Sequence, residues 1–314
     1  MTFVLIPELV GCGRKIPRPV INSVSQNLKL PFGADAAPLG IGGLTLFTSI
    51  DRIGRFCSSL DLFASLAVKH FITDLIACDA SPCQMSLCLE FGPEVGGAAG
   101  ISDLTSAFVS AIVDHGMEVG NLHSVSSEYT AVTACVVGIS SGRQFSLPTA
   151  GKVFLSDYLG AFKALVIGQL DSESVTGKSA FDGRLFLGEL PPMISAASDV
   201  TGFGLLGTLE NLGERHGVQI QASVSTALAF HRDVLEVPIA CIDGGRPGSA
   251  SGERVPAASK LINMSEVAGP MVILCNADQE VEFASWFKSK TSRLPIEIGS
   301  FSKSTSPSVR ISYS

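Results

Sequence analysis

The sequence lacks any run of the roughly 18 uncharged residues that a membrane-spanning helix needs, although its mean hydropathy is +0.38. It also begins without a basic n-region, and Glu8 interrupts the apolar residues at positions 1–10, so a secretory signal is not predicted. These absences predict a cytoplasmic protein without membrane contact.

Charged residues are scarce, at 16% of the chain, and their balance is acidic, with a net charge of -7. The basic footprint of general nucleic-acid binders is therefore missing, and we expect no nucleic-acid partner. Hydrophobic residues make up 46% of the chain, which argues against disorder. A length of 314 residues is enough for two domains of ordinary size.

Closely spaced cysteine pairs are absent as well. The eight cysteines lie at positions 12, 57, 78, 83, 88, 135, 241 and 275. Cys78, Cys83 and Cys88 are evenly spaced, but zinc sites favour C-x2-C pairs with histidines close by, so buried thiols are the better interpretation. Disulfides are not expected in a chain of this length without a secretory signal.

Cys12 has a different setting from the other cysteines. It lies between two glycines and is followed by Arg14 and Lys15. Positive neighbours lower the pKa of a thiol and favour the reactive thiolate. Cys12 is therefore a candidate for a reactive residue.

Four aspartates lie in segments that otherwise contain small or apolar residues: Asp35, Asp51, Asp74 and Asp199. A carboxylate in such surroundings is costly unless it is paired or bound to a cation. Several that converge could hold the hard divalent metal that a nucleotide triphosphate carries. Two simpler interpretations stay open: a buried Asp74 satisfied by a cap or a backbone amide, and Asp199 as a helix N-cap.

Hydrophobic periodicity predicts a strand and then a helix around two of these aspartates. Residues 44–51 alternate as a strand does, and Asp51 would end that strand. Residues 60–77 predict a helix on which Asp74 points to the apolar side. The opposite, polar face of this helix would carry Asp61, Ser65, Lys69 and Thr73.

The rest of the chain continues the β-α-β alternation. In the first half we expect a strand at 86–91, a glycine-rich turn at 92–100, a helix capped at 102–103 that ends near 115–116, and a strand at 130–139. In the second half we expect short apolar runs at 153–155 and 165–167, a helix at 201–215 and late strands at 272–275 and 296–298. Residues 168–188 and 243–259 predict loops, and a domain boundary is expected near 140–150.

Several motifs carry a family resemblance. Residues 198–207, SDVTGFGLLG, resemble the signature of selenophosphate synthetase (selenide, water dikinase), and residues 11–17, GCGRKIP, resemble its N-terminal GCGCK-[IV]-P loop. Asp35 lies where the family has a DDAAV-type aspartate. Residues 48–51 resemble its TSVD strand end, residues 71–75 its NALSD helix, and His123–Ser124 the end of its GGHS turn. The motifs follow the family's order across almost the whole chain.

The resemblance implies a mixed α/β (α+β) fold with the two-domain architecture of the aminoimidazole ribotide synthetase-like superfamily. That superfamily also includes thiamine-phosphate kinase and the hydrogenase-maturation dehydratase. The implied organisation is a mobile lead segment at 1–30, an N-terminal ATP-binding and dimerisation domain at 31–145, and a C-terminal α/β domain at 146–314. A homodimer through the N-terminal sheets is implied in the same way.

The implied reaction converts ATP, selenide and water into selenophosphate, phosphate and AMP. Cys12 would be the essential thiol and Lys15 a phosphate contact. The implied magnesium ligands are Asp35, Asp51, Asp74 and Asp199, and the implied ATP contacts are Lys15, Asp51, Asp74, His123 and Ser124. Magnesium prefers oxygen ligands, and phosphoryl transfer mainly needs positioning and charge neutralisation.

The sequence departs from the family pattern at several places. Arg14 replaces the second cysteine of the lead loop, and the family's GGKP, GGHS and DPQTSGG motifs are altered at 79–82, 121–124 and 263–269. Three hypotheses follow: an active selenophosphate synthetase, a catalytically weak nucleotide-binding homologue with a regulatory role, and a related kinase in which Arg14 binds a different anionic acceptor.

Other tempting features have simpler interpretations. The glycine run at 96–100 is more typical of a turn before a helix than of a phosphate loop. His123 is more typical of a surface or packing residue, and His70 is interpreted as structural.

Overall fold

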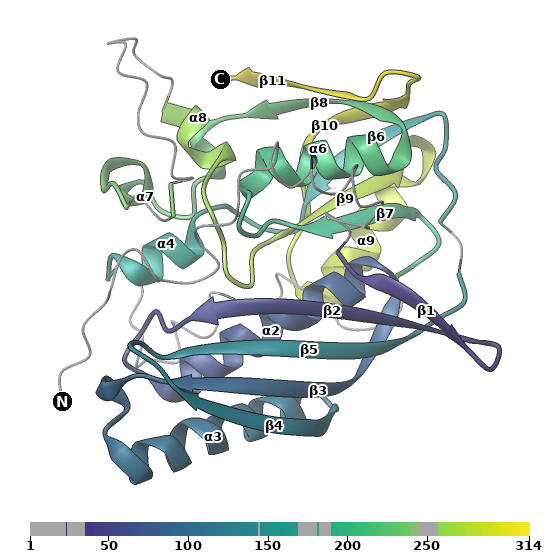
Figure 1. The fold of residues 1–314 in the computed structure, drawn as a ribbon. Helices are drawn as coiled ribbons and strands as arrows, with labels where there is room; N and C mark the ends of the chain where they lie inside the picture. The colour runs from purple at the N-terminus through teal and green to yellow at the C-terminus, as the bar shows by residue number, and fades with distance from the viewer. Residues whose placement is uncertain are drawn as a thin grey trace.

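The computed structural model describes residues 35–143, 145–168, 190–239 and 257–314, together with Ser23, Phe181, Ile242 and Asp243. These residues form two β-sheets with helices packed on and between them (Figure 1). Cys12, Arg14, Lys15 and most of the two predicted loops lie outside the described residues.

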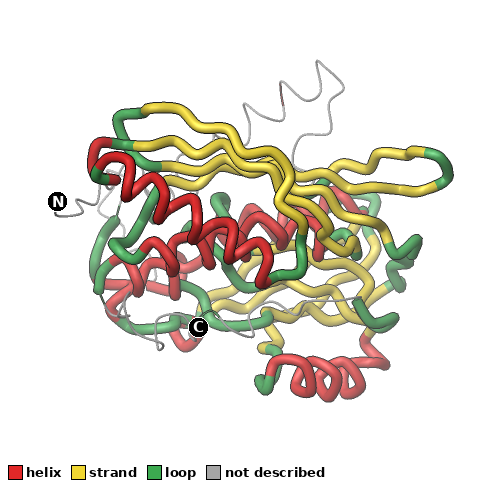
Figure 2. Tube along the Cα trace, turned by 90° about the horizontal axis from the view of Figure 1, so that it is seen from below, coloured by secondary structure: helices red, strands yellow, loops and turns green. Residues whose placement is uncertain are grey.

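The first sheet has the strand order β1-β2-β5-β3-β4. Its strands are β1 (Ala37–Ile41), β2 (Leu44–Gly54), β3 (Ala80–Phe91), β4 (Glu118–Ser126) and β5 (Ala131–Ser140). The β1–β2 hairpin pairs Ile41 with Leu44, and β3–β4 is a parallel pair. Helices α2 (Leu60–Ala77) and α3 (Gly97–Asp114) cover one face of this sheet (Figure 2).

Strand β2 alternates as predicted, but it is longer than expected. Ser49 and Ile53 are buried, whereas Ile50 on the other face is 72% exposed. Asp51 does not end the strand, which continues to Gly54 through its pairing with β5. Asp51 therefore shares the inner face with Ser49, directed towards α2.

Helix α2 has the predicted bounds. Ser59 caps it by accepting a hydrogen bond from the backbone N–H of Leu62 at 3.2 Å. The predicted polar face is wrong for Ser65 and Thr73, which are both buried. Fourteen of the 18 residues in this helix are buried, because α2 packs on the first sheet and on strand β7 of the second sheet.

Two further predictions in the first half are corrected by the structure. Helix α3 begins at Gly97 rather than after Ser102, and its N-cap is Gly96 in the left-handed region, with φ 83°. The predicted turn at 121–124 lies inside strand β4, whose residues 121–126 are all exposed. A polar edge strand of this kind shows no alternation of buried and exposed residues, so its sequence does not reveal it.

The second sheet has the order β11-β8-β10-β6-β9-β7. Its strands are β6 (Ala150–Leu155), β7 (Ile194–Asp199), β8 (Val218–Val224), β9 (Met271–Asn276), β10 (Ile296–Lys303) and β11 (Ser308–Tyr313). The helices of this half are α4 (Ala161–Val166), α6 (Gly204–His216), α7 (Asp233–Glu236), α8 (Ala257–Ile262) and α9 (Glu280–Thr291). The predicted late strands at 272–275 and 296–298 are confirmed as parts of β9 and β10.

The chain passes from the first sheet to the second between Ser140 and Ala150. Within this passage, the guanidinium of Arg143 donates hydrogen bonds to the carbonyls of Leu190 and Pro191, at 2.6 and 2.9 Å, and to that of Ile194. The passage is thereby tied to the start of β7, the strand that carries Asp199.

Aromatic packing joins the two halves. The ring of Phe56 lies edge-to-face with Phe63 of α2 and with Phe162 of α4, at 5.2 Å between centroids in both cases. Such contacts add to the free energy gained from burial. None of the helices in the described ranges is long and apolar enough to cross a membrane.

Candidate metal and nucleotide site

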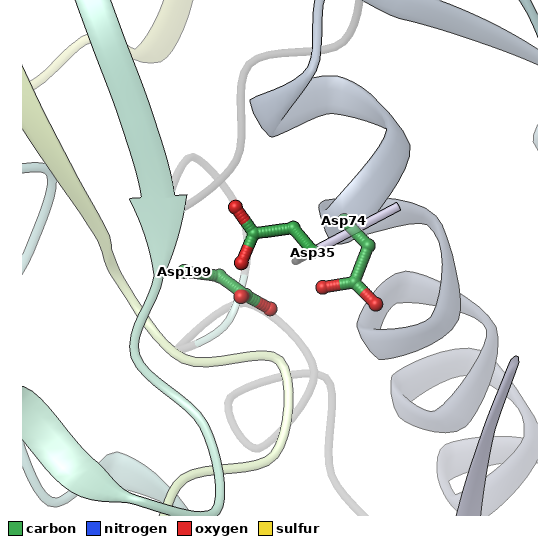
Figure 3. Close-up of side chains that lie close together, drawn as sticks. All are labelled: Asp35, Asp74 and Asp199. Carbon is green, nitrogen blue, oxygen red and sulfur yellow. The ribbon is translucent and has the colours of Figure 1, made fainter. Parts of the chain in front are cut away.

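Three of the four predicted aspartates meet where the two sheets approach each other. Asp35 precedes β1, Asp74 lies in the last turns of α2, and Asp199 is the last residue of β7. One carboxylate oxygen from each lies within 4.8 Å of the others. Figure 3 shows the three side chains close together between the end of β7 and α2.

Asp199 is placed by a strand that is buried along its whole length. The chain leaves β7 through residues 200–203, and α6 begins at Gly204, which has φ +65°. A Cβ at Gly204 would meet the carbonyl oxygen of Ile262 at 2.7 Å, so glycine is required there. The N-cap interpretation of Asp199 is wrong, because Phe203 occupies the N-cap of α6.

Asp74 is held by a hydroxyl of the neighbouring strand. Ser49 Oγ donates to Asp74 Oδ2 at 2.5 Å. Burial raises the pKa of Asp74 well above its ordinary value, and the nearby charges of Asp199 and Asp35 raise it further. The donor to Asp74 is therefore a side-chain hydroxyl, and not the cap or backbone amide that the simpler interpretation expects.

Asp35 accepts hydrogen bonds from two residues of the second half. Ser198 Oγ donates to Oδ1 at 3.0 Å, and Arg215 Nη1 donates to Oδ2 at 2.7 Å as part of an ion pair. Burial opposes the charged guanidinium, but the carboxylate of Asp35 outweighs it and raises the pKa of Arg215. Arg215 comes from the last turn of α6.

Hydroxyl groups connect the two halves across this cluster. Ser198 of β7 donates to Asp35 of the first half, and Thr73 of α2 donates to Asp199 of the second half. These hydroxyls and Arg215 were not predicted as site residues. Ser49, Thr73 and Ser198 each lie one or two positions from a predicted aspartate, whereas nothing in the sequence around Arg215 points to Asp35.

Asp51 does not join the three-carboxylate group. Its Oδ2 lies 2.9 Å from His70 Nε2, and its Oδ1 accepts from the backbone N–H of Arg52 at 2.7 Å. His70 is 2% exposed, and its Nδ1 accepts from the backbone N–H of Ala268 at 3.3 Å. This network assigns the imidazole proton to Nε2, which donates to Asp51. His70 thus links β2 to the altered motif at 263–269.

The remaining predicted residues lie elsewhere. His123 and Ser124 are exposed in β4, on the opposite side of β5 and β3 from β2 in the strand order. Within this chain they are not brought to the carboxylates. Cys12 and Lys15 fall outside the described residues.

The donor set of the cluster fits a hard divalent cation. Asp35, Asp74 and Asp199 offer carboxylate oxygens, the ligands that Mg²⁺ prefers. A cation there would also offset the mutual repulsion that, after burial, raises the pKa of Asp74. Among the described residues no cysteine or histidine belongs to such a group. The six described cysteines are free thiols.

Comparison with solved structures places this geometry in a known fold. ThiL in complex with AMPPCP and TMP superposes with a TM-score of 0.65 at 16% identity, covering 99% of this chain and 96% of that chain. HypE from E. coli gives 0.61 at 17% identity, covering 94% and 93%. The chain has the two-domain aminoimidazole ribotide synthetase-like fold.

The predicted fold class is therefore confirmed. Thiamine monophosphate kinase from Aquifex aeolicus shows the same likeness, with a TM-score of 0.62 at 15% identity over 93% of this chain and 96% of that chain. No protein-family model and no curated protein matches the sequence. At identities this low, the structural likeness establishes the shared fold alone.

Proposed function

We propose that this protein is an ATP-dependent phosphotransferase whose acidic cluster binds the magnesium ion of the nucleotide. The observation that carries the proposal is the convergence of Asp35, Asp74 and Asp199 from three distant segments at the junction of the two halves. Solved structures of the same fold support it, because ThiL is complexed with AMPPCP and a HypE is complexed with ATP.

The side chains of the cluster have distinct roles in this proposal. Asp35, Asp74 and Asp199 hold the cation, which when bound neutralises phosphate charge. Ser49, Thr73 and Ser198 orient these carboxylates by hydrogen bonds. Such fixed orientation matters because phosphoryl transfer depends mainly on positioning and electrostatics.

We further propose that the acceptor is selenide, and that the products are selenophosphate, phosphate and AMP. This step rests on the motif resemblance, above all on residues 198–207, which contribute Ser198, Asp199 and the required Gly204 to the site. Cys12 serves as the selenide-handling thiol and Lys15 as a phosphate contact.

Phosphorus NMR of the purified protein with ATP, Mg²⁺ and selenide under anaerobic conditions tests both the phosphotransferase activity and the choice of selenide as acceptor. Selenophosphate and AMP appearing together support the dikinase. ADP without AMP supports a phosphotransferase with a different acceptor. Intact ATP in the presence of demonstrated ATP binding contradicts both. A Cys12→Ser variant is expected to lose the selenide-dependent products and to retain ATP binding; wild-type rates in that variant would remove Cys12 from the mechanism.

A second candidate function, a nucleotide-binding homologue with weak catalysis and a regulatory role, is favoured by one observation. Two of the four predicted ligands are already engaged by basic side chains, Asp35 by Arg215 and Asp51 by His70. A site with such partners holds metal less tightly than free carboxylates do. The NMR experiment separates the two functions, since the second predicts bound but unconverted ATP.

We also propose that the protein is a homodimer that pairs through the open face of the first sheet. In the part of the chain that the structure describes, no helix covers this face (Figure 2). Three apolar side chains on it are strongly exposed: Leu44 at 60%, Ile50 at 72% and Ile139 at 44%. Exposed apolar surface of this kind marks interaction sites.

Light scattering of the wild type and of Ile50→Glu tests the dimer. Burial of a carboxylate in an apolar interface is costly, so the variant is expected to be a folded monomer and the wild type a dimer. Val281→Glu on α9, where Val281 is 74% exposed, is the matched control and stays dimeric. A monomeric wild type contradicts the proposal.

A further inference from the structure

Arg215 brings a full positive charge into contact with the acidic cluster. Its Nη1 lies 2.7 Å from Asp35 Oδ2, and the Asp35 side chain is only 8% exposed, compared with 29% for Arg215. In a pair this enclosed, solvent screens the attraction less than it does between surface charges. The contact joins α6 to the segment before β1, 180 residues apart in sequence.

The hydroxyl partners of the cluster carry no charge. Ser49, Thr73 and Ser198 donate hydrogen bonds, but they cannot balance carboxylate charge. Burial and the adjacent guanidinium lower the pKa of His216, the neighbour of Arg215. Arg215 is therefore a cationic partner that reduces the repulsion among Asp35, Asp74 and Asp199.

We propose that Arg215 is an internal counter-ion of the acidic cluster and competes with the divalent cation for Asp35. The inference rests on the proposed metal site. Oδ2 of Asp35 is the oxygen that accepts from the guanidinium, and a cation bound among the three carboxylates would lie close to that guanidinium. Metal binding must therefore either displace Arg215 or bear the repulsion of a second positive charge.

The position of Arg215 suits displacement. It lies in the last turn of α6, and its side chain is long and nearly a third exposed. The guanidinium can therefore leave Asp35 towards solvent without disturbing the buried start of α6. Arg215 thus stabilises the metal-free protein and weakens its affinity for metal, so it is a positioning residue that tunes the site.

The test measures Mn²⁺ binding to the full chain without nucleotide, and the EPR signal of free Mn²⁺ reports how much has bound. Arg215→Met keeps the bulk of the stem and removes the charge, and its affinity is expected to rise about tenfold, since removing a unit charge a few ångströms away has an effect of that order. Arg215→Lys keeps the charge and should remain close to wild type. Arg232→Met is the matched control, because it changes the net charge equally at a side chain that is 86% exposed.

A second readout is thermal unfolding with and without Mn²⁺. Arg215→Met is expected to lower the Tm of the metal-free protein and to enlarge the rise in Tm that Mn²⁺ produces. If Arg215→Met does not fold, Arg215→Gln, which retains a hydrogen-bond donor, replaces it in both measurements.

The outcomes separate this inference from the proposed function. Wild-type binding of Mn²⁺ that is lost in Asp199→Asn but is no tighter in Arg215→Met overturns the counter-ion role and leaves the metal site intact. No binding to either wild type or Arg215→Met overturns the metal site and the competition together. Tighter binding in Arg232→Met as well would reduce the effect to net charge and overturn the specific role of Arg215.

Discussion

The second half of the molecule matches its acids with partners one at a time, whereas the junction of the halves brings three acids together. Asp157 pairs with Arg293 at 2.5 Å and Asp243 pairs with Lys163 at 2.5 Å. Glu266, fully buried, accepts hydrogen bonds from the backbone N–H groups of Gly160 and Phe162 at the start of α4. At each of these places a negative charge meets its own donor.

The junction follows a different rule. One carboxylate oxygen from each of Asp35, Asp74 and Asp199 lies within 4.8 Å of the others, and burial together with the charges of the other two raises the pKa of Asp74. A paired acid stabilises the fold, but acids crowded together cost stability unless a cation is added. The charge balance around an acid, more than its burial, therefore distinguishes a candidate site from a structural ion pair.

Neutralising an acid of the junction should change activity more than any other substitution considered. Asp74→Asn or Asp199→Asn should lower Mg²⁺-dependent ATP turnover more than about a hundredfold, because the cation loses a ligand whose charge it needs. The free energy of unfolding without metal should stay equal or rise, since repulsion is relieved. Steady-state kinetics and urea unfolding check the two parts; unchanged turnover in both variants would sink the metal assignment.

Neutralising a paired acid should do the opposite. Asp157→Asn leaves Arg293 without its carboxylate, and because Arg293 is 38% exposed we expect a loss of about 1–3 kcal/mol in unfolding free energy rather than the full cost of a buried charge. Urea unfolding measures this loss. Mn²⁺ affinity should remain at the wild-type value, and a weakened affinity would show that the two kinds of acid are not separate.

Asp51 is intermediate between the clustered acids of the junction and the paired acids of the second half, and its substitution should have an intermediate effect on metal binding. It contributes no ligand to the three-carboxylate group, but its charge adds to the field that raises the pKa of Asp74. Asp51→Asn should therefore weaken Mn²⁺ binding by less than about tenfold, and EPR titration beside Asp74→Asn measures the difference. Equal losses in the two variants would place Asp51 among the ligands, as the family resemblance implies.

The pH dependence of stability should also change, but only slightly. The pKa of Asp74 is raised in the folded state, so the folded protein binds more protons than the unfolded chain above about pH 4. The protonated Asp74 therefore favours the folded state at low pH, and this stabilisation is lost as the pH rises through the folded-state pKa. Tm of the metal-free protein, compared between about pH 5.5 and about pH 7.5, should fall less in Asp74→Asn than in the wild type. Identical slopes would contradict the shift.

Local sequence was sufficient for some parts of this structure. Helix α2 was predicted with its bounds from the helical periodicity of residues 60–77. The tertiary partners were not predictable in this way. Arg215 and Asp35 are 180 residues apart in the sequence. Nothing in the sequence near His70 or near Ala268 indicates that the backbone N–H of Ala268 will donate to the His70 ring. Strand β4 was missed because both of its faces are exposed.

Helix α2 has a consequence for how the molecule unfolds. One side of it completes the core of the first sheet, and the other packs on β7, with Thr73 bonded to Asp199 across the boundary. Phe63 adds a link through Phe56 to Phe162 of the second half. A helix shared by two cores cannot leave one without exposing the other. The two sheets therefore belong to one cooperative unit, and they should melt in a single transition rather than as two independent domains.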